Sequence, residues 1–179
     1  DVAAASEVVV FHAAPAAIVP RRPGTYRPPP RGSRRAEPLS RTARRPPHAV
    51  PVRIHILVNP MAGRGRAPQR VADLERALVS RGAEVTVRRT TGPGDAARHV
   101  GTLAPGDLDR LVVVGGDGTL HEAVNGRERL PWPVAMVPLG TANLVARDAV
   151  VPLGADVAPH VRTILEGVPW EVDLLQTDR

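Results

Sequence analysis

From residue 52 onward, short apolar runs alternate with longer stretches in which apolar residues recur three or four positions apart. The short runs are rich in β-branched residues, which is typical of strands. Four of them predict strands, at 53–58, 84–89, 111–114 and 134–137, and a further strand is predicted at 170–175. The stretches with helical spacing predict helices at 68–82, 95–103, 120–124, 144–150 and 157–166.

Strands that alternate with helices at this spacing indicate βαβ units, whose right-handed crossovers build a parallel sheet. The predicted fold class is therefore α/β, an open and mainly parallel sheet with helices on both faces, Rossmann-like in type. Ligands of such sheets bind outside the carboxyl ends of the strands. Four loops are expected to meet at that edge, at Asn59, Thr90, 115–119 and 140–143.

The first fifty residues differ in composition from the rest. They hold nine Arg, three acidic residues and nine of the twenty prolines, whereas residues 51–179 hold fifteen Arg and fifteen acids. Such a segment cannot bury enough apolar surface to offset its ordering entropy. We therefore predict a disordered Arg/Pro-rich tail at 1–50 and one nucleotide-binding domain at 51–179.

The charge of the tail leaves three interpretations open. It could tether the protein to anionic lipid or nucleic acid, it could be a solvated tail, or it could be upstream codons of an arginine-rich genome read as protein. Among the arginines, Tyr26 is the one aromatic residue that could stack on a base, so we expect no nucleic-acid partner.

Residue types that are missing from the whole chain exclude several kinds of chemistry. There is no Cys, so disulfides and thiolate metal sites are excluded, and all 24 basic residues are Arg. A mechanism that needs a lysine on ATP phosphates is therefore excluded. No apolar run approaches the roughly 18 residues of a membrane-spanning helix.

The sequence Gly115-Gly116-Asp117-Gly118-Thr119 follows the strand predicted at 111–114 and opens the helix after it. Glycines there can present bare N–H groups to a phosphate at the positive end of the helix dipole, and Thr119 adds a hydroxyl. An acid beside a phosphate is repulsive unless it caps a helix, bonds a sugar or amine, or faces Mg²⁺. The residues thus predict a phosphate site and leave these roles open for Asp117.

These five residues resemble the signature shared by diacylglycerol-kinase-type lipid kinases, NAD kinases and, loosely, phosphofructokinases. Two further matches favour the lipid-kinase branch. Asn59-Pro60-Met61-Ala62-Gly63 is similar to its Asn-Pro-x-(Ser/Ala)-Gly loop, and 138–143, followed by Ala146-Arg147, is similar to its second nucleotide loop. Thr90 ahead of Gly94-Asp95-Ala96 matches a further position. The resemblance runs from about residue 52 to residue 175.

The chain departs from the family pattern at two positions. His121 stands at a position where members of the family commonly have Asn. Leu144 follows Thr141-Ala142-Asn143, at a position where members of the family often have Asp. His121 is expected to be exposed or to cap its helix. His55, His99 and His160 have no metal-ligand spacing and are predicted to be surface residues.

The resemblance implies that ATP lies across the four loops and passes its γ-phosphate to a lipid hydroxyl, such as that of diacylglycerol. Asp117 is the implied catalytic residue, ATP and Mg²⁺ are the implied cofactors, and no metal ligand is identified. The implied location is the cytoplasm, peripherally at the membrane that holds the lipid, and a homodimer is left open. The implied nucleotide contacts are Asn59, Pro60, Met61, Ala62, Gly63, Thr90, Gly115, Gly116, Asp117, Gly118, Thr119, Leu120, His121, Glu122, Gly140, Thr141 and Asn143.

Members of that family continue into a β-rich second domain that lines the lipid cleft and supplies a general base and acidic Mg²⁺ ligands. This chain begins at Asp1 without an initiator Met and ends at Arg179, so we expect a fragment, with that second domain starting near 171–179. Alone it is expected to have negligible turnover. Two alternatives stay open: a non-catalytic nucleotide-binding remnant or regulatory module, and an NAD-kinase-like enzyme.

Overall fold

The computed structural model describes residues 6–12, 50–149 and 151–174. The strands are β1 (Ser6–His12), β2 (Arg53–Val58), β3 (Glu84–Arg89), β4 (Arg110–Gly115), β5 (Val134–Pro138) and β6 (Val168–Leu174). The helices are the short 3-10 helix η1 (Ala62–Gly65), α1 (Ala67–Val79), α2 (Asp95–Thr102), α3 (Asp117–Val124), α4 (Leu144–Asp148) and α5 (Ala158–Glu166).

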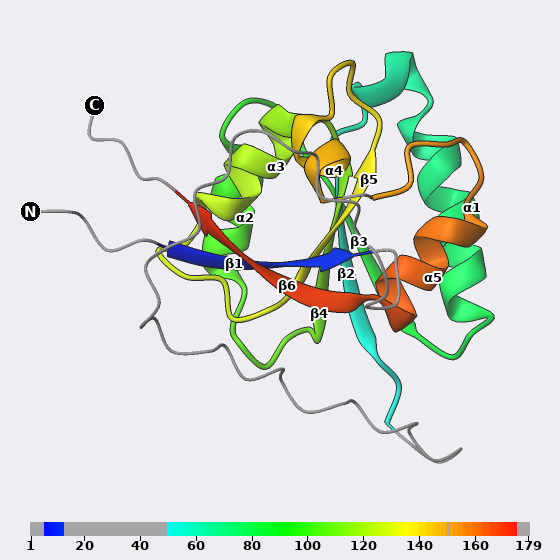
Figure 1. The fold of residues 1–179 in the computed structure, drawn as a ribbon, viewed down its shortest axis with the longest axis horizontal. Helices are drawn as coiled ribbons and strands as arrows, with labels where there is room; N and C mark the ends of the chain where they lie inside the picture. The colour runs from blue at the N-terminus through cyan, green and yellow to red at the C-terminus, as the bar shows by residue number, and fades with distance from the viewer. Residues whose placement is uncertain (1–5, 13–49, 150, 175–179) are drawn as a thin grey trace, which may run out of the picture. The chain divides into compact units, whose positions relative to one another are not determined.

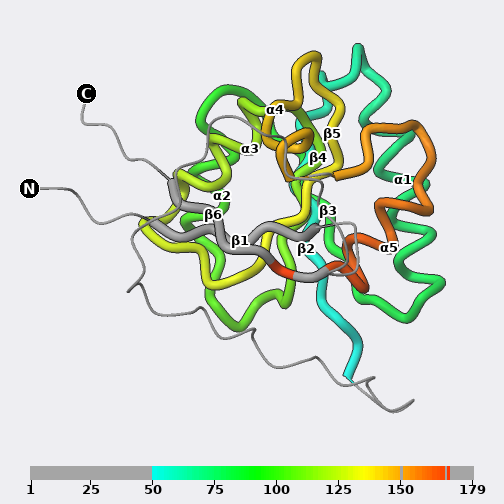
Figure 2. The backbone as a smooth tube through the Cα atoms, viewed as in Figure 1, coloured from blue at the N-terminus to red at the C-terminus, as the bar shows by residue number. Residues whose placement is uncertain are grey.

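The strands form one sheet in the order β3-β2-β4-β5-β1-β6 (Figure 1). Figure 2 traces the backbone of the parallel strands β3, β2, β4 and β5. Strands β3, β2, β4 and β5 are parallel to their neighbours, β1 pairs in parallel with β5, and β6 is antiparallel to β1. The predicted α/β class with a mainly parallel sheet is therefore confirmed.

Helices cover both faces of the parallel strands, with α1 and α5 on one side and α2 and α3 on the other (Figure 1). Alternate residues of β4 divide between the two cores: Val112 and Val114 pack with α1 and α5, whereas Leu111 and Val113 pack with α2 and α3. Burial on both faces explains why β4 is a continuous apolar run rather than an alternating one.

The register of the parallel strands brings their carboxyl ends to one level. Val58 at the end of β2 is opposite Val114, and Gly115 at the end of β4 is opposite Pro138 of β5. The loops that follow these strands therefore start side by side. This is the edge at which the sequence places the candidate site.

Strand β1 lies within the segment that the sequence predicts to be disordered. For Ser6–His12 that prediction is wrong, because these residues pair with β6 along their whole length, from Ser6 opposite Leu174 to His12 opposite Val168. The rest of the predicted tail, 1–5 and 13–49, lies outside the described residues.

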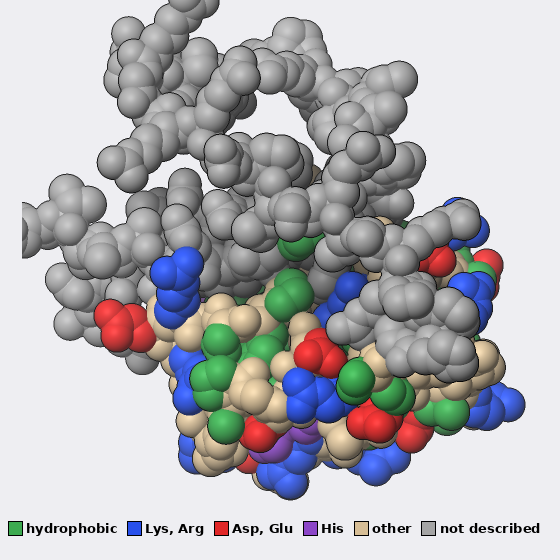
Figure 3. Space-filling model, turned by 90° about the horizontal axis from the view of Figure 1, so that it is seen from below, with side chains coloured by type: hydrophobic (Ala, Val, Ile, Leu, Met, Phe, Trp, Pro, Cys, Tyr) green, Lys and Arg blue, Asp and Glu red, His purple; other side chains and the backbone are tan. Residues whose placement is uncertain are grey.

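The described surface is mixed in charge. On the face drawn in Figure 3, Arg side chains are interspersed with Asp and Glu. Exposed ion pairs such as Arg53–Asp109, with 3.0 Å between nitrogen and oxygen, contribute little stability each. Within the described ranges, no helix is long and apolar enough to cross a membrane.

The packing of α1 generates a test of the core. Leu78 is fully buried, whereas its neighbour Val79 is 53% exposed. Leu78→Ala is expected to lower the free energy of unfolding by about 2–5 kcal/mol, because it leaves a cavity between α1 and the sheet. Val79→Ala is the control. It should change the free energy of unfolding, measured by urea denaturation, by less than about 0.5 kcal/mol. Equal losses in both variants would contradict this placement of α1.

Candidate functional site

The loop after β4 and the loop after β5 are joined through their main chains. The Gly115 carbonyl accepts a hydrogen bond of 2.7 Å from the N–H of Leu139. One residue further, the two chains touch: a Cβ built on Gly140 would lie 2.7 Å from the Cα of Gly116. A Cβ on Gly116 would lie 3.1 Å from the Cα of Gly140. Both glycines are needed because two backbones meet here, whatever ligand binds.

Asp117 makes the next connection between the same two loops. Its Oδ2 accepts a hydrogen bond of 3.1 Å from the N–H of Leu144, and its Oδ1 accepts one of 3.3 Å from the N–H of Val145. These are the first two residues of α4. Among the roles that the sequence leaves open for Asp117, the structure shows a helix cap, and the helix is α4 rather than α3.

The loop after β5 is also closed on itself by Asn143. The Asn143 Oδ1 accepts the N–H of Gly140 at 2.9 Å, and its Nδ2 donates to the Gly140 carbonyl at 2.8 Å. Asn143 is buried and has a left-handed backbone, with φ of 49°. Asn tolerates this conformation better than most residues. The shape of the loop is thus set by Asn143, while Thr141 remains exposed.

Asn59 ties the loop after β2 to the same edge. Its N–H donates to the Val114 carbonyl at 3.1 Å, and its Nδ2 lies 3.5 Å from the Thr119 Oγ1. Its Oδ1 accepts the N–H of Met61 at 3.0 Å, which turns the chain back toward η1. Asn59 therefore connects this loop with both β4 and α3.

The loop after β3 is held by Asp95. The N–H and hydroxyl of Thr91 donate to its Oδ2, at 2.8 and 3.1 Å, and Arg88 lies 3.4 Å from the same oxygen. The N–H of Thr91 does most to lower the pKa of Asp95, and its hydroxyl and Arg88 act in the same direction. The N-cap of α2 is Gly94. Asp95, the first residue of the helix, fastens the loop back to the end of β3.

The structure brings several predicted site residues together, namely Asn59 with Thr119, Gly116 with Gly140, and Asp117 with the helix after Asn143. Thr90 begins its loop at the same edge, where its N–H donates to the end of β2. Leu120 does not fit the predicted role, because its side chain is buried in the core beside α2. The exposed members of the predicted set are Met61, Gly118, Thr141 and His121.

Three contributors to the site were not predicted from the sequence: Leu139, Leu144 and Val145. Each acts through its main-chain N–H, which every residue except proline carries. In the sequence, Leu144 stands out only as a departure from the family pattern. No residue type marks such a donor in a sequence, so only the placement of α4 against Asp117 reveals it.

Comparison with known proteins identifies the family of this chain. The family described as "Diacylglycerol kinase catalytic domain" matches residues 53–177. Diacylglycerol kinase of Bacillus subtilis (strain 168) is 30% identical over 128 residues, which cover 70% of this chain and 42% of that protein. The diacylglycerol kinase of Staphylococcus carnosus (strain TM300) is 31% identical over 124 residues, covering 68% of this chain and 40% of that protein.

Solved structures agree in fold. A crystal structure of a diacylglycerol kinase from Bacillus anthracis str. Sterne superposes with a TM-score of 0.53 and 28% identity, over 62% of this chain and 40% of that chain. The chain belongs to the diacylglycerol kinase catalytic domain family. It spans about 42% of the length of the Bacillus subtilis relative that it matches. The match favours the lipid-kinase branch over the NAD-kinase branch.

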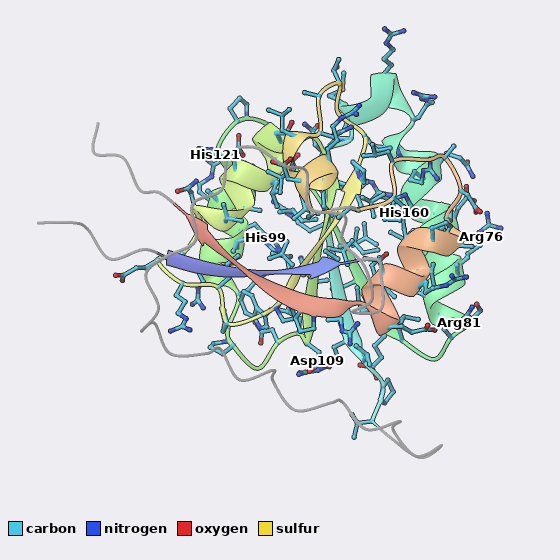
Figure 4. The ribbon with its side chains drawn as sticks, viewed as in Figure 1. Arg76, Arg81, His99, Asp109, His121 and His160 are labelled. Carbon is cyan, nitrogen blue, oxygen red and sulfur yellow. The ribbon has the colours of Figure 1, made fainter. Side chains whose placement is uncertain are left out.

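Away from the carboxyl edge of the sheet, two histidines form a polar contact between the sheet and α2. The Nε2 atoms of His55 on β2 and His99 on α2 lie 2.8 Å apart, and the Nδ1 of His55 lies 2.7 Å from the Thr86 hydroxyl. Figure 4 labels His99. Burial lowers the pKa of His55 to about 4, and His99 and Arg88 add to the effect. Burial likewise lowers the pKa of His99.

The prediction that these histidines are surface residues is wrong. His55 and His99 are half-buried, and His160 on α5 is buried among the residues that pack on the opposite face of the sheet. Burial also lowers the pKa of His160, whose Nδ1 has no hydrogen-bond partner among the described residues. The periodicity of an amphipathic strand or helix is the same whether a histidine ring on it is solvated or bonded to a second histidine, so the sequence does not distinguish the two.

These shifts predict a dependence of stability on pH. An unfolded histidine titrates near 6.5, so between that value and the lower folded pKa the unfolded chain binds more protons. The free energy of unfolding should therefore be constant above about pH 7 and fall as the pH drops from about 6.5 toward 4. Urea denaturation across this range measures it.

His99→Gln should reduce this dependence, because it removes one titrating ring and one charge that faces His55. The matched control is His121→Gln, since His121 is an exposed histidine on α3 (Figure 4). An unchanged pH profile in the His99 variant would show that the pair does not control acid stability.

Proposed function

We propose that this chain is the ATP-binding part of a lipid kinase that transfers the γ-phosphoryl group of ATP to a lipid hydroxyl, such as that of diacylglycerol. Family membership and the names of the relatives support the reaction class. The loops that meet at the carboxyl edge of β2, β4 and β5 support ATP as the ligand, because ligands of open parallel sheets bind at that edge.

Gly118 is the observation that carries the proposal. It lies in the first turn of α3, it is exposed, and a Cβ built on it would meet none of the described residues within 4 Å. Glycine inside a helix costs roughly 0.5–1 kcal/mol relative to alanine, and no contact in the described part of the chain requires it here. The close approach of a ligand supplies the reason, since N–H groups at a helix N-terminus bind phosphate.

The chemistry of the edge suits phosphoryl transfer without lysine. The loose transition state asks mainly for positioning and for neutralisation of charge on the transferred group. Backbone N–H groups of the glycine turn and the hydroxyl of Thr141 supply donors. Arg64 and Arg66, exposed on the loop after β2, supply positive charge at the same edge.

The described residues do not fit a protein-held Mg²⁺. Within these ranges, no three His, Asp or Glu side chains gather where they could hold a metal ion. Asp117, the acid in the glycine turn, already accepts two N–H groups. We therefore assign no metal ligand among these residues.

The proposed function also has a domain and a cellular location. The nucleotide-binding domain is assigned to 51–179, and the acceptor lipid places the reaction at the surface of a membrane that faces the cytoplasm. Asp117 is the acid that the family pattern implies for catalysis, and its carboxylate accepts hydrogen bonds from the N–H groups of Leu144 and Val145.

The direct test uses the longest natural polypeptide that contains this chain. With ³²P-labelled ATP and diacylglycerol in mixed micelles, we expect label in phosphatidate, separated by thin-layer chromatography. Transfer of label to NAD would contradict the proposal. Binding of ATP without any transfer would instead favour a non-catalytic nucleotide-binding module.

Gly118→Ala separates binding of ATP from stability in the same polypeptide. The melting temperature should stay the same or rise slightly, because the new methyl group points into open space and alanine favours helix. The affinity for ATP, measured by calorimetry, should fall by roughly tenfold, which is the loss of one phosphate contact. Gly118→Val should lose more.

Gly106→Ala is the matched control for this substitution. Gly106 lies in the loop before β4, at the opposite edge of the sheet, and a Cβ there would also meet no described residue within 4 Å. The affinity of the Gly106→Ala variant for ATP should equal that of the unaltered protein. Full ATP affinity in the Gly118 variants would show that this turn does not bind the phosphates of ATP.

A further inference from the structure

Asp117 connects the two loops that the proposed function places around ATP. We propose that Asp117 is a positioning residue: its carboxylate holds the first turn of α4 against the glycine turn before α3, and this fixes the spacing of the two loops. The role in positioning ATP rests on the proposed function, whereas the connection itself rests on the geometry alone.

The need for this connection follows from the small size of α4. The helix has five residues, Leu144–Asp148, and isolated helices of that length are unstable in water. The first N–H groups of any helix lack an intrahelical acceptor. The N-cap residue Asn143 makes no capping bond, because its side chain is bonded to Gly140. Asp117, 27 residues earlier in the chain, supplies the missing acceptor for Leu144.

This role also explains how an acid can stand beside a phosphate. A carboxylate at a helix N-terminus is stabilised by the N–H groups and by the helix dipole, which offset its negative charge. Both oxygens of Asp117 are engaged in this way, one with each N–H. The N–H groups of Gly116 and Gly118 then remain for the nucleotide.

Strand β4 supplies a matched control at its other end. Asp109 precedes β4 and accepts hydrogen bonds from the main-chain N–H of Arg53, at 2.8 Å, and from its guanidinium, at 3.0 Å. Figure 4 labels Asp109 at the lower end of the view, away from α3 and α4. Both acids therefore fasten a neighbouring segment, but only Asp117 does so at the edge proposed for ATP.

The first experiment measures the hydrogen bonds between Asp117 and α4 directly, by amide hydrogen exchange followed by NMR on the 179-residue chain. The amides of Leu144 and Val145 should be protected in the unaltered protein and exchange at least tenfold faster in Asp117→Ala. Asp117→Asn keeps one acceptor oxygen and should retain part of the protection. In Asp109→Ala, these two amides should be unaffected. Unchanged exchange in Asp117→Ala would overturn the proposal.

The second experiment asks whether the connection positions the nucleotide. In the kinase assay, Asp117→Ala should raise KM for ATP by roughly tenfold, the size expected from losing one helix cap, with a smaller fall in kcat. Asp117→Asn should recover part of the affinity. Asp109→Ala should lower the melting temperature without changing KM for ATP.

Two outcomes would overturn the positioning role. If kcat collapsed equally in Asp117→Ala and Asp117→Asn with KM unchanged, Asp117 would be a catalytic residue. If KM rose equally in the Asp109 variant, the effect would be general destabilisation. Should Asp117→Ala not fold, the isosteric Asp117→Asn carries both measurements. A protein that binds no ATP would overturn the proposed function, while the exchange result would still decide whether the connection exists.

Discussion

The contact between the main chains of Gly116 and Gly140 sets the geometry of the whole candidate site. Two backbones can meet this closely only where neither residue has a side chain, since a Cβ on Gly140 would lie 2.7 Å from the opposite Cα. The contact exists because β4 and β5 end in register, with Gly115 opposite Pro138. The loops after these strands therefore leave the sheet side by side.

Side chains from outside the contact then hold it in place. Asn143 closes the loop after β5, Asp117 caps the helix after that loop, and Asn59 links the loop after β2 to Thr119. Each bond is made by a short polar side chain to a main-chain or hydroxyl group. Such bonds suit a site that must present N–H groups to an anion, because they fix the backbone. The one charged member, Asp117, has each of its oxygens bonded to an N–H group of α4.

Much of the fold could be predicted because burial on both faces leaves a strong signal. The continuous apolar runs of β4 and β5 and the helical spacing of α1 identify a parallel sheet covered on two sides. Strand β1 could not be predicted in the same way. Its seven residues stand at the start of an Arg- and Pro-rich segment, and its pairing depends on β6, more than 150 residues later in the chain.

The candidate site was predictable in its position but not in its connections. Glycine and asparagine in loops after strands mark a ligand-binding edge, and the loops do meet there. The sequence does not reveal that Asp117 caps α4, because its partners are main-chain N–H groups. Leu120 shows the opposite case: the family resemblance implies a nucleotide contact, whereas its side chain packs in the core together with Ala123 of α3.

The central claim is that bare main-chain N–H groups, exposed where two glycine loops touch, bind the phosphates of ATP without a lysine. A crystal structure with a non-hydrolysable ATP analogue tests it most directly. We predict phosphate oxygens within about 3 Å of the N–H groups of Gly116 and Gly118, with the contact between Gly116 and Gly140 intact. Phosphates bound at another edge of the sheet, or loops that separate on binding, would contradict the account.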